Sequence, residues 1–204
     1  ELSFPSRLEE AGQAANQAAA RGVFTDYAER KAQNTDRRQR VDLATFEQFL
    51  AEVGAACGDL REDPQAWRGV TWGLVAAFQR WQLGQGYAVA SVNIRLSTVK
   101  TFAKLAMKAG VIPAAEYAMI RAVEGYQHKE VPRIDENRAA AGQDTRRSTK
   151  KAAAVLINQV QARALKNQPD TPQGRRDALI MALLLDHGLR VGELALLTVD
   201  CFDL

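Results

Sequence analysis

Apolar residues recur at helical spacing along almost the whole chain, and no long stretch alternates apolar with polar residues as a half-buried strand does. Phe46, Phe49, Leu50 and Val53, for example, follow the i, i+3, i+4, i+7 pattern that places side chains on one face of a helix. Long alanine-rich runs also favour helix. The sequence therefore predicts a mainly α fold, built from amphipathic helices that pack face to face.

Glycine, proline and capping residues divide the predicted helices. We expect helices over residues 6–20, 35–57, 63–83, 91–109, 113–125, 148–166, 175–187 and 191–197. Residues 129–147 are polar and contain Pro132 and Gly142, a composition that predicts a linker. The predicted order is thus an N-terminal arm or peripheral helix (1–29), a helical domain (30–128), the linker, and the beginning of a second domain (148–204).

Positive charge is concentrated in three segments, although the net charge of the chain is only +3. Residues 30–40, 91–110 and 146–151 each carry a surplus of four positive charges. Within the second segment, Lys100, Lys104 and Lys108 are spaced so that a helix presents them in one row with no acid beside them. Solvated helix faces would explain any single segment, but three acid-poor segments favour a polyanionic partner.

Nucleic acid is the polyanion that these segments predict. The candidate DNA-binding residues are Arg37, Arg38, Arg40, Arg95, Lys100, Lys104, Arg147 and Lys150.

Other classes of function find little support in the composition. No apolar run approaches the ~20 residues that span a bilayer, and no secretory signal is visible, so we expect a cytoplasmic protein without a membrane partner. Cys57 and Cys201 lie far apart and match no metal-ligand spacing, which predicts two reduced thiols and no metal site.

One short string carries the strongest indication of chemistry. The sequence GLRVGELALLTVD (residues 188–200) follows an apolar helix and resembles the first active-site box of the tyrosine recombinases, the phage-integrase family. In that family the box supplies the first catalytic arginine, here Arg190. Glu193 lies one helical turn further on, where its carboxylate can support the guanidinium. Gly188 is expected to form the preceding turn with a positive φ.

Two further segments resemble the core-binding domain of the same family. They are NTDRR (residues 34–38) and SVNIRLSTVKTF (residues 91–102). The resemblance implies a helical, SAM-like core-binding bundle followed by the helical N-terminal part of a catalytic domain. It also implies site-specific DNA recombination or integration through a 3′-phosphotyrosine intermediate, with double-stranded DNA as partner, tetramers assembled on DNA, and no cofactor.

The family's remaining catalytic groups have no counterpart in this chain. They are a lysine, a second arginine with a histidine, and a tyrosine nucleophile, all expected after Arg190, whereas Tyr27, Tyr87, Tyr117 and Tyr126 all precede it. His187 and Arg190 have the spacing of the second box, but the predicted helix upstream favours the first. We therefore expect an incomplete part of a recombinase that is inactive alone.

Two alternatives stay open at this point. The chain could be a non-catalytic DNA-binding remnant or regulator derived from an integrase. It could also be a helical protein-interaction domain in which Arg190 and Glu193 form an ordinary ion pair at a helix end.

Overall fold

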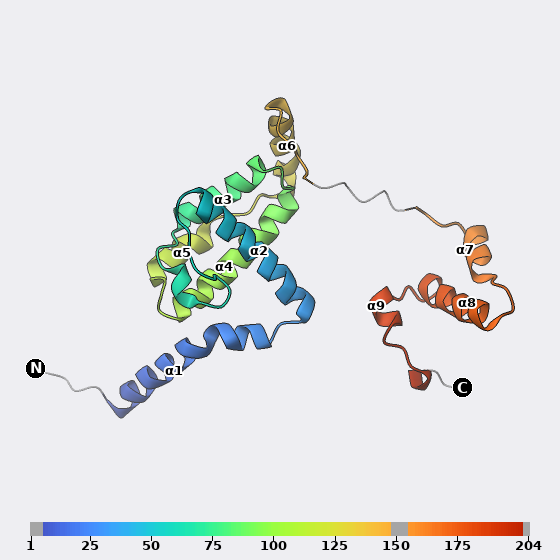
Figure 1. The fold of residues 1–204 in the computed structure, drawn as a ribbon, viewed down its shortest axis with the longest axis horizontal. Helices are drawn as coiled ribbons and strands as arrows, with labels where there is room; N and C mark the ends of the chain where they lie inside the picture. Colours follow the sequence, from blue (N-terminus) through green and yellow to red (C-terminus); the bar gives the residue numbers. More distant parts are fainter. Residues whose placement is uncertain (1–5, 148–154, 202–204) are drawn as a thin grey trace, which may run out of the picture. The chain divides into compact units, whose positions relative to one another are not determined.

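A computed structural model describes residues 6–147 and 155–201, and it divides the chain into two units, Glu1–Lys150 and Lys151–Leu204 (Figure 1). The described residues form helices and turns and contain no strand, which confirms the prediction of a mainly α fold. None of their helices is both long enough and apolar enough to cross a membrane.

The first unit is a bundle organised around one central helix. Its elements are α1 (Arg7–Glu29), α2 (Gln33–Glu52), η1 (Pro64–Trp67), α3 (Trp72–Gly84), α4 (Val89–Lys108), α5 (Ala114–Ala122), η2 (His128–Glu130) and α6 (Val131–Ala140). Helix α4 packs against α1, α2, α3, α5 and η1, so its apolar residues form the centre of the core.

Aromatic side chains fill that core, as their helical spacing predicts. The rings of Phe46 and Phe78 lie 4.9 Å apart, and Trp67 packs against both Phe46 and Phe102. Trp67 is fully buried, and its indole N–H donates to the Leu60 carbonyl at 2.7 Å. The core therefore satisfies the one polar atom of its largest side chain.

Helix α1 continues further than the expected arm over residues 6–20. It begins with a capping box at Ser6 and runs to Glu29, and residues 7–19 are exposed. Phe24 and Tyr27 reach the bundle, with ring centroids 5.8 and 5.5 Å from that of Phe102. The C-terminal part of α1 thus belongs to the core, because Val23, Phe24 and Tyr27 lie there, whereas Leu8 near its start is 82% exposed.

The helix predicted over residues 63–83 is two elements. Asp63 caps only the short turn η1, and the chain becomes extended at Arg68. Thr71 then caps α3 through a hydrogen bond from Leu74 N–H. The prediction was wrong because a carboxylate followed by proline initiates a 3₁₀ turn as well as it initiates an α-helix.

The segment expected to be a linker, residues 129–147, is largely structured and contains η2 and α6. Arg138 on α6 is 5% exposed, and it donates to the Asp135 carboxylate and to the carbonyls of Asp144 and Thr145. Arg138 thus joins α6 to the chain that follows it through two backbone carbonyls, so the low apolar content of this segment did not prevent folding.

The second unit contains α7 (Gln159–Lys166), α8 (Pro172–Leu185), α9 (Val191–Leu194) and η3 (Val199–Cys201). Of the helix expected over 148–166, the described part from residue 155 on is helical from Gln159, where the Asn158 side chain caps α7. Residues 148–154 lie outside the described part. Among described residues of this unit only Gly174 is buried, and Val155, Leu156, Val160 and Leu196 are more than 70% exposed.

Candidate nucleic-acid interface and candidate catalytic arginine

Arg190 stands at the start of α9, directly after a turn. Gly188 has φ = +66°, as the sequence predicted, and Arg190 is the N-cap residue. The Glu193 carboxylate accepts the backbone N–H of Arg190 at 2.8 Å and its guanidinium at 3.0 Å. Glu193 therefore orients Arg190 from both ends of the residue.

The guanidinium of Arg190 faces solvent, since its side chain is 85% exposed and that of Glu193 is 50% exposed. The contact with Glu193 occupies one of the five N–H donors that a guanidinium carries. The others are free to form a bidentate contact with an oxyanion such as a phosphate. An ordinary surface ion pair between Arg190 and Glu193 has the same geometry. A test of chemical activity, rather than the contacts of Arg190, therefore distinguishes a phosphate-binding arginine from such an ion pair.

The three lysines of the α4 row have different surroundings. Lys100 donates to the carbonyls of Arg121, at 3.1 Å, and Val123, which close the end of α5. Burial lowers the pKa of Lys100. Lys104 and Lys108 are exposed and take part in none of the ion pairs of the described residues. The row is therefore one structural lysine followed by two lysines available to a ligand.

Lys108 lies in a groove between α1 and α4. The groove has a volume of about 730 Å³, and Arg30, Lys31 and Lys108 line it together with a single acid, Asp26. An adjoining hollow of about 370 Å³ is lined by Lys100, Lys104 and Lys108. We call Arg30, Lys31, Lys104 and Lys108 the groove cations. The sequence placed Arg30 and Lys31 in a charged segment, but only the packing of α1 on α4 brings them to Lys108.

The arginines at the start of α2 are mostly neutralised by acids. Arg38 pairs with Asp42 at 3.4 Å and Arg40 with Asp36 at 3.5 Å. Asp36 also pairs with Arg61, 25 residues away, and this contact is the main reason its pKa is lowered. Among the described residues, Arg37 forms one side-chain hydrogen bond, to Asn34 at 3.4 Å, and no ion pair, so of the three it is the one left without an acid partner.

Arg95 is a structural cation rather than an exposed one. Its side chain is 14% exposed and lies 3.8 Å from the Asp42 carboxylate and 3.4 Å from the Gln82 side-chain oxygen. The guanidinium also lies over the Tyr87 ring. Arg147 is exposed and donates to the Tyr87 hydroxyl at 3.0 Å, while Lys150 lies outside the described residues.

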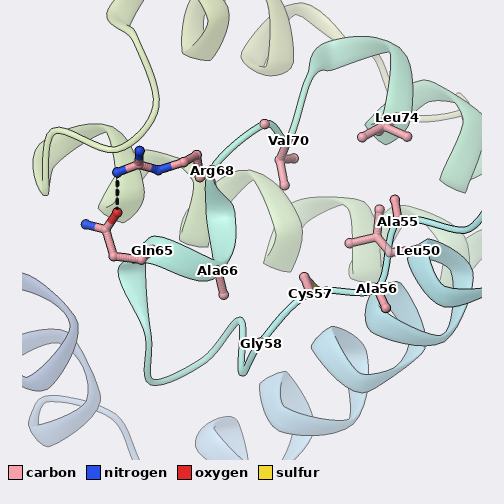
Figure 2. Close-up of a pocket in the computed structure, with 11 residues that line it drawn as sticks. Leu50, Ala55, Ala56, Cys57, Gly58, Gln65, Ala66, Arg68, Val70 and Leu74 are labelled. Carbon is pink, nitrogen blue, oxygen red and sulfur yellow. Dashed lines mark hydrogen bonds between the residues drawn. The ribbon is translucent and has the colours of Figure 1, made fainter.

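A further pocket of about 340 Å³ lies beside Cys57, lined by the loop after α2 and by η1 (Figure 2). The Arg68 guanidinium at its edge donates to the Gln65 side chain at 2.8 Å. Partial burial raises the pKa of the Cys57 thiol, so the thiolate that a nucleophile requires is disfavoured. Within the described residues no cluster of side chains could hold a metal ion.

Replacement of Lys100 and of Lys104 by alanine is expected to separate their roles. Lys100→Ala should lower the free energy of unfolding by about 1 kcal/mol, because the last carbonyls of α5 lose their donor. Lys104→Ala should leave stability within about 0.5 kcal/mol and weaken duplex binding about tenfold at ~0.1 M salt. Urea denaturation and fluorescence anisotropy measure the two effects, and equal effects of the two substitutions on affinity would contradict the assignment.

Comparison with known proteins identifies no relative. The chain matches no protein-family model, no curated protein and no solved structure.

Proposed function

We propose that the protein binds double-stranded DNA through its first unit and carries, as Arg190, the first phosphate-binding arginine of a tyrosine-type site-specific recombinase. The observation that carries this proposal is the arrangement at residues 188–193. A turn presents the guanidinium to solvent at the start of α9, and Glu193 orients it, within the string that resembles the family's first active-site box.

An arginine suits the reaction that the resemblance implies. Transfer of a DNA phosphodiester to a tyrosine hydroxyl concentrates negative charge on the non-bridging phosphate oxygens in the transition state. A guanidinium offers these oxygens two parallel N–H donors and stays protonated at any working pH. Donors held in place before the reaction stabilise that charge without reorganising. Glu193 supplies the holding contact at 3.0 Å.

The burial pattern of the second unit supports its interpretation as part of a larger catalytic domain. Its described helices bury a single residue, Gly174, and leave several large aliphatic side chains exposed. A stable domain buries such side chains around one core. We therefore propose that this unit contributes Arg190 to a site whose lysine, second arginine, histidine and tyrosine come from outside residues 151–204.

A DNA-binding protein without catalysis is the second candidate, and the groove cations favour it specifically. The groove cations lie in the first unit and Arg190 lies in the second, so these cations can attract a DNA duplex without Arg190. A reading frame that carries no tyrosine after Arg190 would select this candidate.

The decisive experiment replaces Arg190 by alanine in the protein encoded by the complete reading frame. Cleavage of a nicked duplex that traps the phosphotyrosine product should fall at least about a hundredfold, because a preorganised donor to the oxyanion is lost. Duplex affinity should stay within about twofold, since the first unit supplies most phosphate contacts.

The matched control is Arg175→Ala. Arg175 is also exposed, on the neighbouring α8, and it pairs with Asp170 at 2.7 Å. It should leave cleavage unchanged. If the Arg190→Ala and Arg175→Ala variants cleave the nicked duplex equally well, Arg190 only forms an ordinary surface ion pair with Glu193, and the recombinase proposal fails.

A further inference from the structure

Tyr87 joins two arginines that lie far apart in sequence. It occupies the turn between α3 and α4, and the guanidinium carbons of Arg95 and Arg147 lie 4.0 and 5.3 Å from the centre of its ring. Arg147 also donates to the Tyr87 hydroxyl at 3.0 Å. The ring therefore binds one cation from α4 and one from the segment that follows α6.

Two like charges beside one ring repel each other unless an acid is close. The Asp42 carboxylate, 3.8 Å from Arg95, supplies part of the compensation. The face of an aromatic ring attracts each guanidinium by about 0.5–1 kcal/mol at exposed sites. Arg95 is therefore stabilised both by the Asp42 carboxylate and by the Tyr87 ring, and Arg147 contacts the same ring at the surface.

The backbone beside Tyr87 leaves room for the segment that follows α6. Gly86 has φ = +79°, and a Cβ atom at this position would lie 3.1 Å from the Cβ of Asp144. A larger residue would therefore be strained by its own conformation and would also push against Asp144. Nearby, the buried Arg138 donates to the carbonyls of Asp144 and Thr145.

We propose that Tyr87 is an anchor, a positioning residue that holds residues 144–147 against the bundle through Arg147. Arg138 fixes the beginning of this segment and Tyr87 fixes its end. The described part of the first unit is consequently held in place as far as Arg147, beyond the end of α6.

Backbone ¹⁵N relaxation of the chain without DNA tests the anchor. The order parameters of residues 146 and 147 should be about 0.85 in the unaltered protein and fall below about 0.6 in Tyr87→Ala and in Arg147→Ala, whereas residues 144 and 145 stay held by Arg138. Tyr87→Phe keeps the ring but not the hydroxyl and should give intermediate values.

Arg146→Ala is the control, because Arg146 is exposed and its side chain forms no hydrogen bond or ion pair with another described residue. It should leave the order parameters unchanged. Arg147 lies at the surface, so its replacement cannot unfold the core, and unchanged α4 amide shifts verify this. Order parameters below about 0.6 in the unaltered protein, or values insensitive to both Tyr87→Ala and Arg147→Ala, would overturn the anchor. Neither result would affect the duplex-binding proposal, since no DNA is present.

Discussion

Replacement of all four groove cations by alanine should weaken duplex binding about a thousandfold at ~0.1 M salt. Each cation that neutralises a phosphate releases about 0.9 counterion, so four lost contacts remove the driving force of about 3.6 released ions. Arg30, Lys31 and Lys108 line one groove, and Lys104 lines the hollow beside it, so on the proposed function we expect one duplex backbone to contact all four. Fluorescence anisotropy with a labelled duplex measures the loss.

A control variant that loses the same number of positive charges elsewhere distinguishes an effect of the groove from an effect of net charge. Arg7, Arg68, Lys129 and Arg133 are exposed cations elsewhere on the first unit. Their joint replacement by alanine changes the net charge by the same amount and should weaken binding less than about tenfold, because only long-range attraction is lost. Similar losses in the two variants would mean that the groove is not the binding surface.

Trp67→Ala is expected to destabilise the first unit by about 3–5 kcal/mol, enough to unfold a marginally stable domain. Trp67 is 0% exposed and contacts the rings of Phe46 and Phe102. Alanine would leave a cavity among these rings, and the Leu60 carbonyl would lose the donor that now lies at 2.7 Å. Urea denaturation followed by circular dichroism gives the free energy of unfolding.

Trp72 provides the comparison within the same chain. It lies five residues further on, at the start of α3, and is 47% exposed. Trp72→Ala should therefore lower the free energy of unfolding by less than about 1 kcal/mol. If Trp67→Ala lowers the free energy of unfolding by no more than Trp72→Ala does, Trp67 is not part of an aromatic core.

Hydrophobic periodicity predicted most of the fold because it reports directly which face of a helix is buried. It located α2 and α4 and their apolar stripes, including Phe46 and Phe102. It failed where local signals are ambiguous, as at Asp63, whose cap starts a 3₁₀ turn. It also failed at residues 129–147, where the buried Arg138 organises a polar segment and leaves no apolar pattern.

Charge counting along the sequence was a weaker guide to the candidate interface. Arg95 belongs to an acid-free segment of sequence, yet Asp42 of another helix lies 3.8 Å away. Lys100 shares the spacing of Lys104, but the end of α5 engages it. Such partners are distant in sequence, so only the packing of the helices reveals which cations remain available. The contact between Arg190 and Glu193 was predictable because it lies within one helical turn.

The salt dependence of duplex binding by the chain itself tests the central proposal most directly. Anisotropy titrations of a duplex of about 30 base pairs between ~50 and ~200 mM salt should give a log–log slope of about −4 or steeper. The variant lacking the four groove cations should be shallower by about 3.6. A chain that binds no duplex at ~50 mM salt, or binds with a slope near zero, would contradict double-stranded DNA as the partner.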